Sequence, residues 1–490
     1  MHRLRSSCRL RLSAALPLSA ALLLAACAGP PPGGDLEVVV AGEPEQATAM
    51  AETLAAEASR ATLITRAGNG ALAPGLATSW RFLDEGNDLI LRLAPVRWPG
   101  KDGKPGPELE ARDVVAGLRR LPKSARPALD AAGLAGRGTA RAPIARVVEL
   151  TPRPATPFLL DWLADPALAV VDRRGRLFPG PYERARADGE IRLTRRGDLV
   201  RPDAQAATIV VKTAEPSAAI ARYVARDRPL VLGAGLAGLA DARAAGQGRA
   251  LRIEPVHGVI GLAINSKGTL ADARLRRALL LASDGAAVAS RFGLGALTAQ
   301  TRLWDGLPAP ADDRARPLAE RQAMAAALLA DVGGLGPGKP LTLTIVLPAG
   351  PEASLLADAL SAALAPVGIM LRPVRAPRGA GSSVPPHDLA LAERVAHVPD
   401  PAAHLARWQC GQAQPCSTQA DALLAGARRA GSDLAARAEA VDRAEQAMMA
   451  DPAFIPLLRP VRWSLVPDGL SGFEANPLGW HPLGRISRAR

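Results

Sequence analysis

Near the middle of the chain, an apolar run of strand length leads through a short turn into an amphipathic helix. Residues Val259 to Ile264 carry no polar side chain, and the turn-prone sequence Asn-Ser-Lys-Gly follows them. Asp272 then stands where a helix N-cap would, and apolar side chains recur after it at helical spacing. These apolar residues are Leu275, Ala278, Leu279 and Ala282. On this pattern Arg274, Arg276 and Arg277 face away from the apolar side. A buried strand that feeds an amphipathic helix predicts an α/β protein.

The overall composition is ordinary for a globular protein. Hydrophobic residues make up 48% and charged residues 22% of the 490 residues, enough chain for roughly two to four domains. The formal net charge is +13, but the lysines and arginines are scattered and form no block of five or more like charges. We therefore expect a solvated basic surface and no nucleic-acid partner.

The N-terminal residues have the pattern of a targeting segment. Four arginines precede an apolar run from Leu12 to Ala26, which is too short to span a bilayer. The run ends in Leu-Ala-Ala-Cys, which matches the lipobox of bacterial lipoproteins, whose cysteine thiol takes the lipid. We expect Cys27 to be that lipid anchor. The alternative is a plain secretory signal in which Cys27 is incidental.

Several motifs resemble one protein family. The string Gly261 to Lys267, followed by Asp272 to Leu279, resembles a signature of family 5 of the bacterial extracellular solute-binding proteins. That family holds the oligopeptide- and dipeptide-binding components of ABC importers. Leu76 to Trp80, Val96 to Trp98 and Leu109 to Val115 match further family blocks in the same order. The resemblance implies that the strand at Val259 passes between two lobes.

The resemblance also implies an architecture. We expect an α/β, two-lobed periplasmic-binding-protein type II fold, with mixed sheets and a hinge between the lobes. The expected boundaries are a lipoprotein signal peptide at 1–27, a tether at 28–35, lobe I at 36–260 with an inserted subdomain at about 71–170, lobe II at 261–463, and a return to lobe I at 464–490.

A glycine-rich segment has the outline of a dinucleotide-binding fingerprint. Gly233 to Gly238 follows an apolar run, and Glu254 lies about twenty residues after it. The helix between them would be only about ten residues long, however, and Gly246-Gln-Gly248 interrupts it. We favour a glycine-rich turn in lobe I and expect no cofactor.

Metal-binding and catalytic patterns are weak. His387, His397 and His404 are spaced by ten and seven residues, which does not place them on one helix face, so we expect surface or pocket histidines and no metal. We find no nucleophile elbow, P-loop or paired-carboxylate signature. The sequence therefore predicts no catalytic residues, and a protein that is not an enzyme.

The four cysteines separate into two groups. Cys8 lies in the segment expected to be removed and Cys27 is the expected anchor, which leaves Cys410 and Cys416. An even pair in an exported protein indicates a disulfide, and this small ring would contribute only about 2 kcal/mol of stability. A metal site would require further cysteines or histidines nearby.

The resemblance directs attention to one position in the predicted cleft. Where the family commonly reads Ala-Asp-Tyr, and where its peptide-binding members use that Asp to accept the peptide α-ammonium, this chain has His397. A neutral imidazole cannot neutralise an ammonium ion. Either the ligand lacks a free amino terminus, or Asp400 or Glu393 takes over, or the protein has drifted from peptide binding. Trp304 and Trp408 are the aromatics placed nearest the cleft, with core packing as the alternative. The expected ligand-binding residues are Glu43, Trp304, Glu393, Arg394, His397, Asp400 and Trp408.

The resemblance implies a transport function. We expect a monomeric, periplasmic, lipid-anchored binding protein that captures a peptide-like solute and delivers it to an ABC permease and ATPase in the inner membrane. The alternatives are a binding protein for a non-peptide solute, and a lipoprotein that senses or scaffolds without transport.

Overall fold

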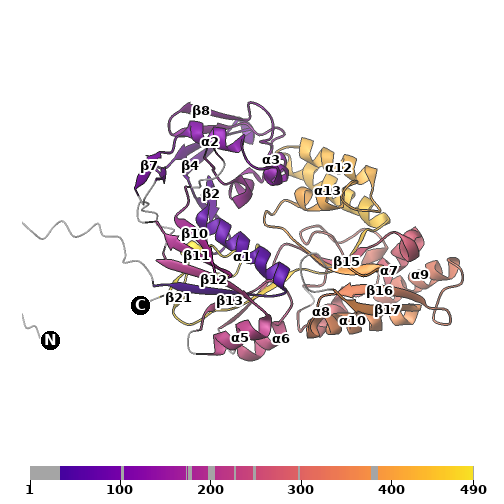
Figure 1. Ribbon diagram of the computed structural model, residues 1–490. Helices are drawn as coiled ribbons and strands as arrows, with labels where there is room; N and C mark the ends of the chain where they lie inside the picture. The colour runs from indigo at the N-terminus through magenta and orange to yellow at the C-terminus, as the bar shows by residue number, and fades with distance from the viewer. Residues whose placement is uncertain are drawn as a thin grey trace, which may run out of the picture.

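The computed structural model describes residues 34–488, apart from short gaps at 101–103, 173, 175–178, 197–204, 226–227, 247–249, 296–297 and 377–383. The predicted signal peptide and most of the predicted tether lie outside the described residues. The chain forms a mixed α/β protein with two principal sheets, each in its own lobe (Figure 1).

Lobe I is built on a seven-stranded mixed sheet with the order β10-β11-β12-β1-β13-β20-β14. Its strands are β1 (Leu36–Ala41), β10 (Tyr182–Ala187), β11 (Glu190–Arg195), β12 (Thr208–Ala214), β13 (Leu230–Gly233), β14 (Leu251–Pro255) and β20 (Val461–Leu465). Its helices are α1 (Pro44–Ser59), α5 (Pro216–Val224) and α6 (Leu239–Ala245). The short strands β21 (Leu470–Ser471) and β22 (Ser487–Arg488) pair near the C-terminus.

The central strand β1 is apolar from Val38 to Ala41 because both of its faces are covered there, and its one charged residue, Glu37, is only partly buried. Val38 and Val40 pack in the cluster that contains α1, whereas Val39 and Ala41 belong to the cluster that contains α5 and α6. Its neighbours β12 and β13 run parallel to it. A parallel strand buried on two faces has no polar alternation, which explains the run of three valines.

A subdomain with its own core is inserted into lobe I. It contains a four-stranded sheet in the order β4-β5-β9-β8 and lies above the lobe I sheet in Figure 1. Its strands are β2 (Ile64–Arg66), β3 (Leu72–Pro74), β4 (Ala77–Leu83), β5 (Asp88–Leu93), β6 (Arg97–Pro99), β7 (Pro105–Glu108), β8 (Ala140–Ile144) and β9 (Val147–Leu150). Its helices are α2 (Ala111–Leu118), α3 (Arg126–Ala131) and α4 (Leu159–Leu163).

Lobe II is built on a five-stranded sheet with the order β17-β16-β18-β15-β19. Its strands are β15 (Gly258–Ile264), β16 (Leu341–Leu347), β17 (Ile369–Arg375), β18 (Leu389–Val395) and β19 (Phe454–Leu458). Its helices are α7 (Ala273–Ala282), α8 (Gly285–Arg291), α9 (Leu318–Asp331), α10 (Pro351–Leu364), α11 (Pro401–Leu405), α12 (Thr418–Arg429) and α13 (Leu434–Ala450).

The predicted strand, turn and helix are confirmed as β15 and α7. Asp272 caps α7, because its carboxylate accepts a hydrogen bond of 2.8 Å from the backbone N–H of Arg274. Within β15, a Cβ at Gly261 would lie 1.9 Å from the carbonyl oxygen of Ile455, so only glycine permits the close approach of β15 and β19 there.

One expectation for α7 is wrong. Arg276 does not face away from the protein but is buried, and its guanidinium pairs with the carboxylate of Asp451 through two hydrogen bonds of 2.7 Å. It also donates to the carbonyls of Leu270 and Ala271. A buried arginine is tolerated because these acceptors satisfy its donors.

The chain crosses between the lobes twice, and the two crossings lie side by side. The first joins β14 to β15 at residues 256–257, and the second joins β19 to β20 at residues 459–460. The backbone N–H of Val256 donates to the carbonyl of Pro460 at 2.8 Å, and Arg459 donates to the carbonyl of Val256 at 3.2 Å. The expected boundary after residue 260 therefore falls inside β15, and the boundary after residue 463 falls inside β20.

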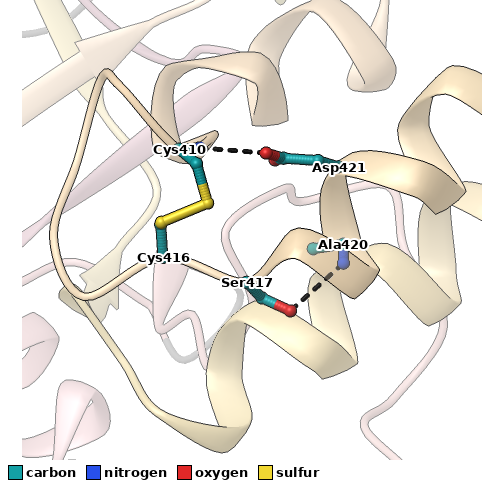
Figure 2. Close-up of a disulfide and its surroundings, with 5 residues drawn as sticks. All are labelled: Cys410, Cys416, Ser417, Ala420 and Asp421. Atoms are coloured by element: carbon teal, nitrogen blue, oxygen red, sulfur yellow. Dashed lines mark hydrogen bonds between the residues drawn. A yellow bond between two sulfur atoms is a disulfide. The ribbon is translucent and has the colours of Figure 1, made fainter.

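The predicted disulfide between Cys410 and Cys416 is present, with Cα atoms 5.1 Å apart (Figure 2). The backbone N–H of Cys410 donates to Asp421, and the Ser417 hydroxyl accepts from the N–H of Ala420 at the start of α12 (Figure 2). The disulfide therefore lies directly before a capped helix in lobe II.

None of the described helices is long and apolar enough to cross a bilayer.

Candidate ligand-binding cleft

A cavity of about 830 Å³ lies between the two lobes. Lobe I contributes the first turn of α1 and the loop between β13 and α6, and lobe II contributes β15, the end of β16, the first turns of α10 and part of β18. Its lining includes Glu43, Pro44, Glu45, Gln46, Leu236, Ile260, Phe292, Leu347, Glu352, Leu356, Leu391 and Glu393. The volume is in the range of natural small-molecule sites.

The charged residues that line the cavity, within the described parts of the chain, are all acidic. Glu43 and Glu45 come from lobe I, whereas Glu352 and Glu393 come from lobe II. Among the described residues, none that lines the cavity carries a positive charge. The rest of the lining is predominantly apolar, so the carboxylates stand out against walls of low polarity.

Three polar contacts join the lobes around this cavity. The Glu352 carboxylate accepts a hydrogen bond of 2.7 Å from the backbone N–H of Gly238. Arg462 on β20 donates to both carboxylate oxygens of Glu393 on β18, at 2.7 and 3.1 Å. Arg243 on α6 donates to the carbonyl oxygens at the end of α8. Each contact pairs one group from lobe I with one from lobe II, so together they hold the lobes against each other.

The glycine-rich segment at residues 233–238 forms one wall of the cleft. A Cβ at Gly233 would lie 2.3 Å from the indole of Trp463, so the segment packs directly against a fully buried ring. Gly238 has a φ of +75° at the start of α6, where its N–H meets Glu352. The helix that follows has only seven residues. The segment is therefore a turn at the cleft, in keeping with the preferred interpretation of the sequence.

A known protein family matches most of this two-lobed chain. The profile described as "Bacterial extracellular solute-binding proteins, family 5 Middle" matches residues 71–414. The chain belongs to this family. Members are the substrate-binding proteins of ABC importers and are transport proteins, not enzymes. A search of curated protein sequences gave no match.

Solved structures share the fold at low sequence identity. Haemophilus influenzae OppA in complex with the peptide RPPGFSPFR has 17% identity and a TM-score of 0.75, over 93% of this chain and 99% of that one. The Escherichia coli murein tripeptide binding protein MppA has 19% identity and a TM-score of 0.75, over 93% and 98%. Staphylococcus aureus NikA in complex with Ni(L-His)2 has 15% identity and a TM-score of 0.71, over 91% and 98%.

Within this family 5 protein, the residues expected to bind ligand divide into two groups. Glu43 and Glu393 line the cavity. Arg394 is exposed next to Glu393, donates to the carbonyl of Glu393 and does not line the cavity. The remaining four expected residues also lie outside the lining, and each has a different environment.

The Asp400 carboxylate is buried and fully engaged in hydrogen bonds within the protein. It is 2% exposed, and its carboxylate accepts a hydrogen bond of 2.8 Å from Arg437 on α13. It also caps α11 through the N–H groups of Ala402 and Ala403, and accepts a bond of 3.3 Å from the Trp162 indole of the inserted subdomain. Of the two carboxylates considered as replacements for the family's Asp, only Glu393 reaches the cavity.

The placement of Trp304 and Trp408 near the cleft is corrected. Both are buried in the core of lobe II, where their rings pack on either side of the His404 ring at centroid distances of 5.2 and 5.4 Å. His404 is likewise a core residue and not a surface or pocket histidine. The alternative considered for the two tryptophans, core packing, is the one that the structure supports.

His397 follows β18 and does not line the cavity. Its ring is exposed and meets the edge of the Trp480 ring at a centroid distance of 5.8 Å. Desolvation by the surrounding protein, followed by the charges of Arg407 and Arg462, lowers the pKa of His397 to about 4. A lowered pKa keeps the imidazole neutral at physiological pH.

Three charged residues at the cleft were not predicted from the sequence: Glu45, Glu352 and Arg462. Glu45 and Glu352 both follow a proline at the start of a helix, in α1 and α10. Proline followed by an acidic residue is a helix-start signal, which locates each helix but not what it faces. For Arg462, no local pattern distinguishes it from the other arginines.

Among the described residues, no group of three or more histidine, cysteine or acidic residues is arranged to hold a metal ion.

Proposed function

We propose that this binding protein captures a peptide-like solute in the cleft between its lobes and delivers it to an inner-membrane permease and ATPase. The observation that carries the proposal is the cavity of about 830 Å³, lined from both lobes and bordered by contacts that join them. A solute held there would be buried by hinge motion about the paired crossings at residues 256–257 and 459–460. Glu393 is then the candidate partner for a peptide amine, because it lines the cavity and Asp400 does not; a bound amine would share its carboxylate with Arg462.

The test is native mass spectrometry of the protein purified gently from its own host. We expect a heterogeneous set of bound masses that resolve to short peptides, because ligand that binds the folded state is retained when dissociation is slow. The absence of any bound mass, together with no rise in melting temperature from peptide mixtures, would contradict solute capture and favour a sensing or scaffolding role.

A non-peptide solute is a second candidate. It is favoured by the cavity lining, in which no described residue offers a positive charge to a peptide carboxylate. A single non-peptide mass in the same experiment would support it.

We further propose that the protein is held at a membrane on the periplasmic side by lipidated Cys27. Replacing Cys27 with serine removes the thiol that takes the lipid, so we expect the variant to move from the membrane fraction to the soluble fraction. The control is Cys8→Ser, which changes a cysteine ahead of the predicted cleavage site and should stay with the membrane. Membrane association retained by the Cys27→Ser protein would show that the thiol is not the anchor.

A further inference from the structure

The acidic lining of the cleft is not a consequence of overall composition. The chain has 60 lysines and arginines against 47 acidic residues, yet the four charged residues on the cavity lining that the structure describes are all glutamates. They come from both lobes, so closing the cleft brings like charges toward each other. Like charges in a site of low polarity repel unless a cation lies between them.

Existing contacts neutralise only part of this charge. Glu393 is paired with Arg462, and Glu352 accepts the Gly238 N–H without a cation. Glu45 is exposed at the start of α1 and makes no hydrogen bond or ion pair with any described residue. Glu45 and Glu352 therefore have no cationic partner among the described residues, and both keep their negative charge at the cleft.

The remaining walls are mostly apolar, with Gln46 and Thr48 as polar exceptions. Six large apolar side chains contribute to them, one from lobe I and five from lobe II: Leu236, then Ile260, Phe292, Leu347, Leu356 and Leu391. Burial of a ligand's apolar body against these side chains would supply affinity, and the carboxylates would select its charge. A ligand carboxylate would meet no described positive charge and would be repelled.

We propose that the preferred ligand is an amphipathic organic cation: an apolar body with net positive charge and no free carboxylate, such as a short peptide amide or an apolar amine. This inference rests on the proposed capture of a solute in the cleft and specifies its chemical class.

The test is isothermal titration of the full mature protein with three matched tripeptides. Each tripeptide contains two leucines. The first contains lysine and ends in a C-terminal amide, the second has the same sequence with a free C-terminal carboxylate, and the third contains glutamate in place of lysine with a free C-terminal carboxylate. We expect the lysine amide to bind roughly tenfold tighter than its free acid, and the glutamate peptide to bind weakest. Raising ionic strength from about 20 to about 300 mM should weaken the amide most, since screening acts on charge attraction.

Glu45→Gln is the matched variant, because Glu45 is exposed and has no structural partner among the described residues. We expect it to weaken binding of the lysine amide by about three- to tenfold. The control is Glu183→Gln on β10, which removes one exposed carboxylate outside the cavity lining and should leave the affinity within about twofold.

Equal affinities for the three peptides, or tightest binding of a free acid, would overturn the inference while leaving solute capture intact. If none of the three peptides binds, the inference that the cleft prefers an amphipathic cation is overturned for short peptide amides. Native mass spectrometry of the retained ligand decides separately whether the cleft captures a solute, so the two failures are distinguishable.

Discussion

Replacing Glu445 with glutamine is expected to lower the free energy of unfolding by about 3 kcal/mol. Glu445 on α13 is fully buried, and its carboxylate lies 2.9 Å from Arg302 and 2.9 Å from Arg314. It also accepts a hydrogen bond from the N–H of Leu303. A neutral amide would leave two almost fully buried guanidinium groups facing each other. Arg302 keeps Asp442 and Arg314 keeps Asp312 as a carboxylate partner. The expected loss of stability is therefore at the lower end of the range for breaking a buried ion pair.

The matched control is Glu439→Gln on the same helix. Glu439 is exposed and pairs only loosely with Arg443, at 3.8 Å, so its replacement should cost less than about 1 kcal/mol. Urea unfolding followed by circular dichroism gives both values. A difference of less than about 1 kcal/mol between the two variants would show that Glu445 does not hold this part of lobe II together.

Stability is expected to fall in acid partly through one buried histidine. Burial among aromatic rings, and then the charge of Arg407, lowers the pKa of His404 to about 3, while nearby Asp305 opposes the shift and His257 adds to it. In the unfolded chain the His404 imidazole is protonated below about pH 6.5, whereas in the folded protein it stays neutral down to about pH 3. Its contribution to the free energy of unfolding is therefore complete above about pH 6.5 and is lost as the pH falls toward about 3. Between pH 7 and pH 4.5 the loss from His404 alone is about 2–3 kcal/mol.

The variant His404→Phe isolates this effect. A weak contact with the Leu303 backbone is the one polar interaction of the His404 ring among the described residues, so phenylalanine keeps the ring between Trp304 and Trp408 and removes the titration and that contact. We expect its unfolding free energy at pH 7 to stay within about 1 kcal/mol of the parent, with a shallower decline in acid. The control His387→Gln, in the loop before β18, should retain the parent slope. An unchanged acid slope in the His404→Phe protein would contradict the assignment.

Local patterns in the chain were enough to predict the elements that organise the fold. The apolar run that became β15, the Asp272 cap of α7 and the pair Cys410 and Cys416 depend on neighbours within about a dozen residues. The glycine-rich turn could also be distinguished from a nucleotide-binding loop, because the helix after it is too short.

Burial of charged and aromatic side chains could not be predicted in this way. Arg276 is buried because Asp451 reaches it from beyond α13, and Asp400 is occupied because Arg437 and Trp162 converge on it from two other parts of the protein. A single sequence shows the types of these residues but not which of them meet.

The sequence by itself determined the family, the strand and helix that became β15 and α7, and the disulfide, because each is encoded in residue types at short spacing. Only the tertiary structure decided the cleft. Its four glutamates lie at positions 43, 45, 352 and 393, and folding brings them together from α1, α10 and β18. The physical reason is that a site's charge is a sum over groups that are close in space, and the distances between them are set by the packing of two lobes.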